Sequence, residues 1–131
     1  MRTLLITDDH PSVLHTLEFV LGVGDLRVVL ATSGAAALAV IEQGTVDAAL
    51  VDLHMPVMDG LALTRALKDR AVKSARALPV WIMTAAQMPA TVEQARLAGA
   101  EALLKKPFDA EAFRVELLRH LTGCAPAPFA A

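Results

Sequence analysis

Apolar residues gather in five short runs along the chain, and amphipathic stretches separate these runs. The runs cover residues 3–7, 27–31, 48–52, 79–83 and 101–105. Near-continuous apolar runs are typical of parallel strands that are covered on both faces of a sheet. Strands that alternate with helical segments predict right-handed crossovers and a parallel sheet.

The stretches between the runs predict five helices, at about residues 11–21, 34–43, 61–68, 90–97 and 110–121. Pro11 suits the first turn of its helix, and Ser33 and Asp109 are typical capping residues. Asp59 is expected to be a helix cap or turn residue without chemistry. The basic segment 68–77 is predicted to be a solvated loop, in preference to a partner-docking surface.

Five such strand–helix units predict an α/β fold, a doubly wound (βα)5 domain with a parallel five-stranded sheet. We expect the flavodoxin-like strand order 2-1-3-4-5, over a domain of residues 1–122. Residues 123–131 are rich in proline and alanine, and we expect a flexible tail there.

Composition and charge narrow the class of function. The chain has 131 residues, is 55% hydrophobic and carries a net charge of −2, so neither a nucleic-acid surface nor a polybasic membrane patch is expected. Apolar runs this short predict neither a signal peptide nor a membrane span. A single cysteine, Cys124, fits a reducing compartment, and we expect a cytoplasmic protein.

Candidate site residues follow four of the five predicted strands, whereas the second strand ends in Ala31 and Thr32 and offers no charge. Asp8 and Asp9 follow the first, Asp52 ends the third, Thr84 follows the fourth, and the pair Lys105-Lys106 follows the fifth. Ligands of doubly wound sheets bind beyond the carboxyl ends of the strands, so these residues form one candidate site. Crowded carboxylates require a raised pKa or a cation, and oxygen ligands favour a hard ion such as Mg²⁺. A carboxylate with a metal, a hydroxyl and an ammonium around it can act as a nucleophile toward a phosphoryl group.

Four motifs carry a family resemblance. They are TDDHP at 7–11, VDLHMPVMDG at 51–60, MTA at 83–85 and KPF at 106–108. In this order and spacing they resemble the receiver domain of two-component response regulators, in particular the single receivers of the chemotaxis-regulator type. The match covers nearly the whole chain, from residue 2 to about residue 121.

The resemblance implies a role for each matching residue. Asp52 matches the phospho-acceptor, which would take a phosphoryl group from a histidine kinase or phosphotransfer protein. Asp9 and Asp52 would ligate Mg²⁺ or Mn²⁺ directly, Asp8 would act through a metal-bound water, and the backbone carbonyl of His54 would complete the ligands. The remaining roles fall to Lys106 as the conserved-type lysine, Thr84 as the switch hydroxyl, Ala85 and Ala86 as small residues at the phosphoryl group, and Pro107 as a cis-proline.

The resemblance also implies how the protein would work. It would not be an enzyme in the usual sense, but would catalyse its own phosphorylation and dephosphorylation. It would be a monomer or weak dimer whose downstream target binds the surface of the fourth and fifth helices. Many receivers have an aromatic residue three positions before the lysine, at a second switch position, but this chain has Leu103 there.

Three other interpretations are weaker. A receiver-like interaction module that is never phosphorylated would not need Asp8, Asp9, Asp52, Thr84 and Lys106 together. A phosphohydrolase of the haloacid dehalogenase type would need a DxDx[TV] motif after its first strand, where this chain has DDHPS. A dinucleotide site would need more than the GVG at residues 22–24. His10, His15 and His120 lack partners at ligand spacing and are expected at the surface.

Overall fold

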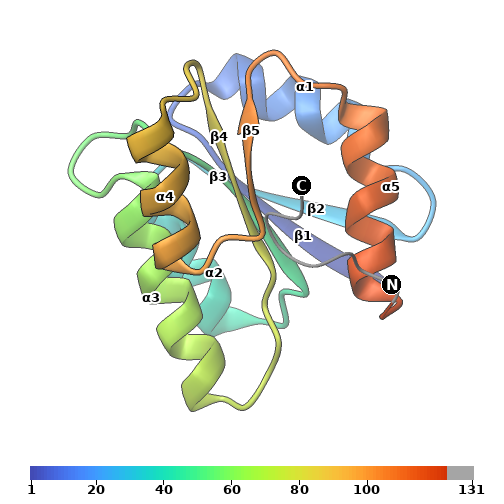
Figure 1. Ribbon diagram of the computed structural model, residues 1–131. Coiled ribbons are helices and arrows are strands. Elements are labelled where there is room, and N and C mark those ends of the chain that lie inside the picture. Colours follow the sequence, from blue (N-terminus) through green and yellow to red (C-terminus); the bar gives the residue numbers. More distant parts are fainter. Residues whose placement is uncertain (124–131) are drawn as a thin grey trace.

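Strands and helices alternate along the chain in the computed structural model, which describes residues 1–123 (Figure 1). The strands are β1 (Arg2–Thr7), β2 (Leu26–Ala31), β3 (Ala48–Asp52), β4 (Val80–Thr84) and β5 (Ala102–Lys105). The helices are α1 (Pro11–Leu21), α2 (Gly34–Gln43), α3 (Gly60–Lys73), α4 (Pro89–Ala98) and α5 (Ala110–Leu121). The tail predicted at 123–131 lies, apart from Gly123, outside the described residues.

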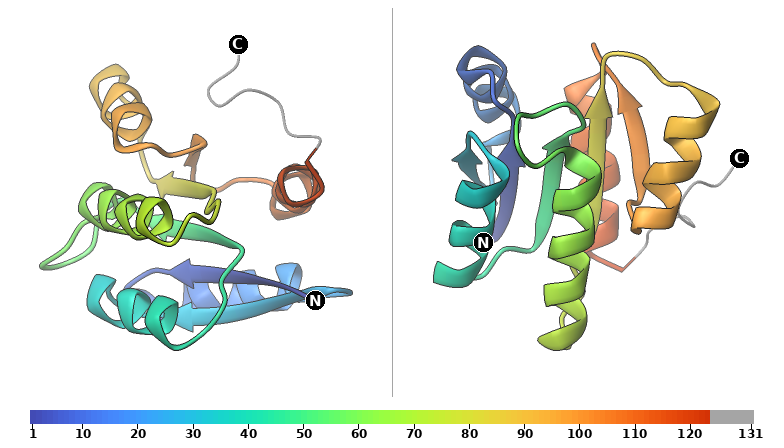
Figure 2. Two further views of the ribbon diagram at one scale, coloured as in Figure 1. Left: turned by 90° about the horizontal axis from the view of Figure 1, so that it is seen from below. Right: turned by 90° about the vertical axis from the view of Figure 1, so that its left-hand side faces the viewer.

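The strands form one parallel sheet in the order β2-β1-β3-β4-β5. Helices α2, α3 and α4 cover one face, and α1 and α5 cover the other (Figure 2). The predicted fold class and strand order are therefore confirmed. Since each central strand is buried on both faces, its apolar run is continuous, and all five residues of β3 and of β4 are buried.

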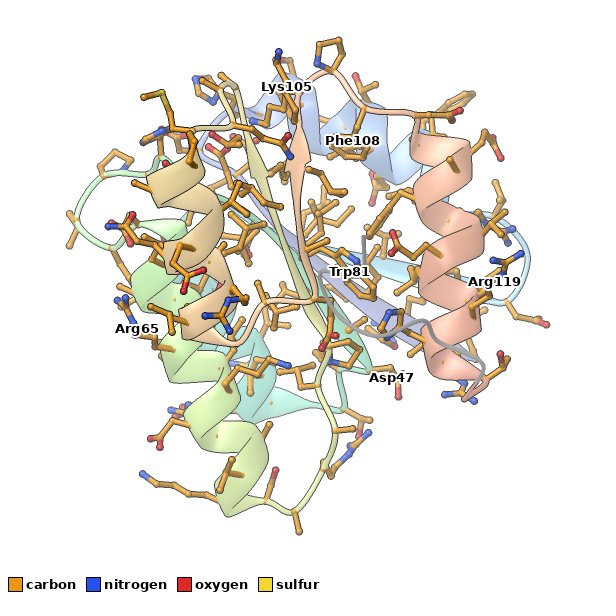
Figure 3. All side chains as sticks on the ribbon, viewed as in Figure 1. Asp47, Arg65, Trp81, Lys105, Phe108 and Arg119 are labelled. Atoms are coloured by element: carbon orange, nitrogen blue, oxygen red, sulfur yellow. The ribbon has the colours of Figure 1, made fainter. Side chains whose placement is uncertain are left out.

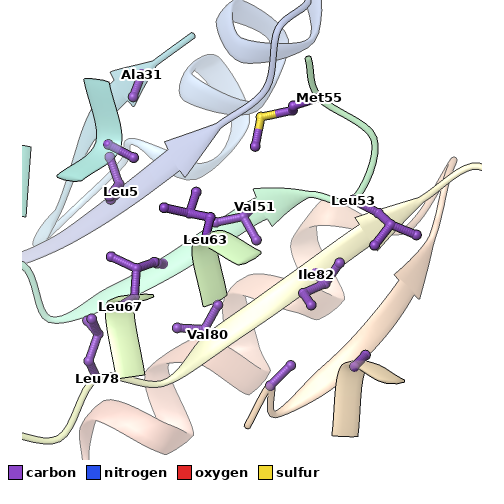
Figure 4. Close-up of a cluster of buried hydrophobic side chains, with 14 of the residues drawn as sticks. Leu5, Ala31, Val51, Leu53, Met55, Leu63, Leu67, Leu78, Val80 and Ile82 are labelled. Atoms are coloured by element: carbon purple, nitrogen blue, oxygen red, sulfur yellow. The ribbon is translucent and has the colours of Figure 1, made fainter. Parts of the chain in front are cut away.

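Alternate residues of each strand enter two separate hydrophobic cores. On one face, Leu63 and Leu67 of α3 pack over Val51, Val80 and Ile82 (Figure 4).

On the other face, the fully buried Trp81 lies beside α5 (Figure 3). Its ring meets those of Phe113 and His120 edge-on, with centroids 5.3 and 4.9 Å apart. The prediction of a surface His120 is wrong to this extent, because the side chain is half-buried against the tryptophan.

Three helices begin at capping side chains. Ser33 Oγ accepts a hydrogen bond from the Ala36 N–H, and Asp109 Oδ1 accepts one from the Ala112 N–H, as predicted for both residues. Asp59 likewise caps α3 through the Ala62 N–H. Asp59 and Asp109 thus fix where α3 and α5 begin, after the segments that follow β3 and β5.

Helix α3 is longer than predicted. It extends to Lys73, so the expectation of a solvated loop over 68–77 is wrong for its first six residues. The physical reason is that Ala71, one helical turn beyond Leu67, still packs against the core, and Arg70 pairs with Glu42 of α2. The other predicted boundaries differ from the structure by one residue or a few.

Within residues 1–123, no helix has both the length and the apolar content needed to cross a membrane.

Candidate functional site

The carboxyl ends of β1, β3, β4 and β5 bring the predicted polar residues to one edge of the sheet. The register pairs Thr7 with Val51, which sets Asp8 beside Asp52. It also pairs Thr84 with Lys105, so that Lys106 follows directly after the paired residues. Figure 3 shows this edge, where Lys105 and Phe108 lie at the end of β5 near the start of α5.

Lys106 joins the two buried carboxylates. Its Nζ lies 3.0 Å from Asp8 Oδ2 and 2.9 Å from Asp52 Oδ1. The side chain of Asp8 is fully buried and that of Asp52 is 7% exposed, whereas Lys106 remains 26% exposed. Because charge-assisted hydrogen bonds of this length are strong in a buried setting, the ammonium fixes the positions of both carboxylates. The Lys106–Pro107 peptide bond is cis.

The pKa directions follow from this arrangement. Burial would raise the pKa of Asp8, but hydrogen bonds from Lys106 and His10 outweigh it and lower that pKa. Burial raises the pKa of Asp52, and the charges of Asp8 and Asp9 add to this effect, while Lys106 opposes it. Burial would lower the pKa of Lys106, but its hydrogen bonds to Asp52 and Asp8 raise it. When all three groups are ionised, the two carboxylates and the one ammonium carry a net charge of −1.

The cluster fits a divalent cation. Ligand atoms of Asp8, Asp9, His10 and Asp52 all lie within 4.8 Å of one another. Asp9 Oδ1 is buried and makes no hydrogen bond within the described chain, although His10 Nδ1 lies 3.1 Å away. Three carboxylates against one ammonium leave two negative charges, and the donors are oxygens of the kind that Mg²⁺ prefers. His54, whose carbonyl was predicted as a ligand, is an exposed residue of the β3–α3 segment.

Thr84 reaches the same edge but turns its hydroxyl to its own loop. Thr84 is fully buried, and its Oγ1 lies 3.1 Å from the Ala86 carbonyl oxygen and 3.3 Å from the Ala86 N–H nitrogen. Its carbonyl accepts a hydrogen bond from the Lys106 N–H at 2.7 Å. Ala85 and Ala86, which directly follow Thr84, are both exposed.

Leu103 lies deeper in the molecule, with only 6% of its surface exposed, in the core beneath α4. Its backbone carbonyl accepts a hydrogen bond from the side-chain amide of Gln87. The sequence analysis singled out Leu103 but not Gln87, because a polar residue in an alanine-rich loop gives no periodic signal.

His10 was also missed as a member of the cluster. Its N–H donates to Asp8 Oδ1 at 2.9 Å, and its ring Nδ1 lies 3.0 Å from the same oxygen. The ring is exposed, as predicted, yet it does have partners. The hydrogen bond between the His10 ring and the Asp8 carboxylate, together with the charge of Asp9, raises the pKa of His10. The signal that could have revealed this contact is the spacing, because an aspartate often accepts from the backbone two residues later.

Comparison with known proteins shows the family to which the chain belongs. The sequence profile of the response regulator receiver domain family matches residues 4–118. The chain is 32% identical over 118 residues to the heme response regulator HssR of Staphylococcus haemolyticus, a match that covers 88% of this chain and 50% of that protein. It is 31% identical over 104 residues to the sensory/regulatory protein RpfC of Xanthomonas campestris, covering 79% of this chain and 14% of that protein. The chain thus spans half or less of the length of these relatives.

Solved structures show the same fold. A response regulator receiver domain protein from Clostridium thermocellum superposes with a TM-score of 0.83 at 22% identity, covering 94% of this chain and 96% of that chain. The chemotaxis protein CheY4 of Vibrio cholerae superposes with a TM-score of 0.79 at 27% identity, covering 95% and 98%.

Proposed function

Since the chain belongs to the response regulator receiver domain family, we propose that it is a signalling switch that accepts a phosphoryl group on Asp52. The observation that carries this proposal is the geometry of Lys106, whose ammonium bridges the buried carboxylates of Asp8 and Asp52. Such a group can hold the oxygens of a phosphoryl group that forms on Asp52, because its ammonium already lies 2.9 Å from an Asp52 carboxylate oxygen.

The transfer exchanges one bond to phosphorus for another. An Asp52 carboxylate oxygen bonds to the phosphorus while the bond to the donor's histidine nitrogen breaks, and the nitrogen keeps the electron pair. Lys106 and the Thr84 hydroxyl would then hold phosphoryl oxygens. Water would later attack the phosphorus and restore the Asp52 carboxylate, along an approach that the small Ala85 and Ala86 leave open. The domain would in this way catalyse its own phosphorylation and dephosphorylation, without being an enzyme in the usual sense.

A divalent cation fits the acidic side of the site. Asp8, Asp9, Asp52 and the His54 carbonyl would hold Mg²⁺ or Mn²⁺, which neutralises charge as the phosphoryl group arrives. Asp9 Oδ1 supports this ligand set, because it is a buried carboxylate oxygen that accepts no hydrogen bond within the described residues, where the exposed His10 ring lies 3.1 Å away.

The phosphodonor would be a histidine kinase or histidine phosphotransfer protein. A cavity of about 440 Å³ lies beside Lys106, between α1 and the β5–α5 segment, with apolar walls that include Val13, Leu17 and Phe108. An apolar surface next to the acceptor suits a helical partner that presents a histidine. We propose that the downstream target binds the surface formed by α4 and α5, where Met88, Leu97 and Val115 are exposed. The chain itself would be a monomer or weak dimer.

The test is labelling by a small acyl phosphate. Acetyl phosphate with Mg²⁺ should add the mass of one phosphoryl group to the wild-type protein, and the label should be lost on incubation in alkali, as acyl phosphates are. Asp52→Ala should remain unlabelled, whereas the matched control Asp69→Ala, which alters an exposed carboxylate of α3, should be labelled normally. Equal labelling of Asp52→Ala and wild type would show that another residue accepts the group. No labelling of the wild type would favour an interaction module that is not phosphorylated, and steady release of phosphate from phosphate esters would favour a phosphohydrolase.

A further inference from the structure

Gln87 ties the segment after β4 to the edge strand of the sheet. Its side-chain Nε2 donates a hydrogen bond to the carbonyl of Leu103 in β5. The amide orientation is unambiguous, because only the NH₂ end of a glutamine can donate to a carbonyl. Among residues 1–123, strand β5 pairs only with β4 and has one edge that no other strand covers.

The backbone pattern places this carbonyl at the open edge. The Lys106 N–H donates inward, to the Thr84 carbonyl of β4. Successive residues of a strand point their backbone groups in opposite directions, so the odd-numbered Leu103 points away from β4. Gln87 thus donates a hydrogen bond to a strand carbonyl that makes no bond within the sheet.

Leu103 cannot respond by turning its side chain. The side chain packs beneath α4 in the same core as Ile82 and Ala95, and only 6% of the residue is exposed. Close-packed interiors resist the displacement of a buried leucine, so a side-chain movement at this position would open the core. The hydrogen bond between Gln87 and the Leu103 carbonyl, at the edge of β5, can break without such a displacement.

The tie is linked to the position of Thr84. The Thr84 hydroxyl is now engaged by the backbone of Ala86, directly before Gln87. To reach a phosphoryl group on Asp52, the hydroxyl has to leave Ala86. The segment from Ala85 to Met88 can follow, because Met88, the residue before α4, makes no side-chain capping bond that would hold it in place.

We propose that Gln87 is a positioning residue that holds the β4–α4 segment in the conformation with Thr84 withdrawn, so that phosphorylation has to break the bond to Leu103. This inference rests on the proposed function and adds the element that sets the balance between its two conformations. A bond made in only one of two states biases the equilibrium toward that state. One hydrogen bond of ordinary net strength corresponds to about a 2- to 10-fold change in that equilibrium.

The variants separate the hydrogen bond from charge and shape. Gln87→Glu keeps the size of the side chain but replaces the donor with an acceptor, so the tie is lost. Gln87→Lys restores a donor at similar reach. Gln94→Glu and Gln94→Lys make the same charge changes at an exposed position of α4.

The measurement is an amide ¹H–¹⁵N correlation spectrum of each 131-residue protein, before and after addition of beryllofluoride and Mg²⁺. For wild type, the two spectra define a line of shifts for the amides of 84–88 and 102–106. Without beryllofluoride, the Gln87→Glu resonances should lie displaced along this line, by the amount that a 2- to 10-fold shift toward the bound state predicts. Gln87→Lys and both Gln94 variants should lie at the wild-type positions.

The outcomes distinguish the two proposals. If Gln87→Glu coincides with wild type, or if its shifts leave the line and stay next to residue 87, the role of Gln87 is refuted while the phosphorylation of Asp52 stands. If beryllofluoride moves no resonance of wild type, and acetyl phosphate leaves Asp52 unlabelled, the function itself is refuted and the inference with it.

Discussion

Gly60 is the residue whose replacement should most directly disturb the end of β3. It begins α3 and packs against the strand that carries the acceptor. A Cβ at this position would lie 2.4 Å from the Asp52 carbonyl oxygen and 2.8 Å from Leu53 Cα. Both contacts are with backbone atoms, so the clash cannot be relieved by a side chain that changes its rotamer.

The magnitude of the effect follows from two opposing terms. Overpacking a rigid site costs about 1–3 kcal/mol, and contacts this short with backbone favour the upper value. Alanine in place of glycine in a helix recovers at most about 1 kcal/mol. We therefore expect Gly60→Ala to lower the free energy of unfolding by about 2 kcal/mol and to slow the labelling of Asp52, since the strand end has to shift.

The assay is urea unfolding followed by the fluorescence of Trp81, which is the single tryptophan of the chain and is fully buried. Gly44→Ala is the matched control, because a Cβ at Gly44 would meet nothing within 4 Å and its φ of −165° suits any residue. The control should be neutral or slightly more stable than wild type. If the two variants unfold at the same urea concentration, the close approach of Gly60 to Asp52 does not constrain this part of the chain.

Three further predictions concern the same edge of the sheet. Val57 has a φ of 70° in a three-residue turn, which a hydrogen bond from the Met58 N–H to the Pro56 carbonyl closes. Because this φ strains a β-branched residue, Val57→Gly should raise the free energy of unfolding, measured by heat or urea, by about 1 kcal/mol. An unchanged or lower stability would show that the turn is unstrained. In EDTA, Asp9→Asn should be at least as stable as wild type. Mg²⁺ at 100 times its dissociation constant should stabilise wild type by about 2.7 kcal/mol, and the variant should lose this gain. Equal shifts of the melting temperature with Mg²⁺ in both proteins would exclude Asp9 as a ligand. Folding raises the pKa of Asp52, mainly by burial, so ionisation of Asp52 favours the unfolded chain. In EDTA, Asp52→Asn should therefore be more stable than wild type at pH 7, and this difference in stability should shrink as the pH falls toward the unfolded pKa of about 3.9. A difference that does not change with pH would contradict the assigned direction of the pKa shift.

Much of the fold could be predicted because it depends on short-range patterns. Apolar runs of four to six residues define the strands, and Ser33 and Asp109 cap helices through bonds to backbone only three residues away. The end of α3 was missed because Ala71 and Arg70 gain their partners from the core and from α2, which no local pattern reveals.

The candidate site was predictable as a set of residues, but not as an arrangement. The ends of parallel strands must share one edge, so Asp8, Asp52 and Lys106 were expected near one another. The resemblance to receivers assigned a role to Leu103 by position alone, and its burial beneath α4 became visible only in the folded chain.

The sequence by itself therefore determined which strands form and which side chains stand at their ends, because hydrophobic periodicity suffices for these features. The strand order was expected from the common doubly wound fold, and the sheet confirmed it. Only the tertiary structure decided that Lys106 bridges Asp8 and Asp52, that His10 contacts the acidic cluster, and that Gln87 binds the Leu103 carbonyl. Lys106 and Asp8 are 98 positions apart in the chain. A hydrogen bond depends on tenths of an ångström and on side-chain direction, which are fixed only when both cores are packed.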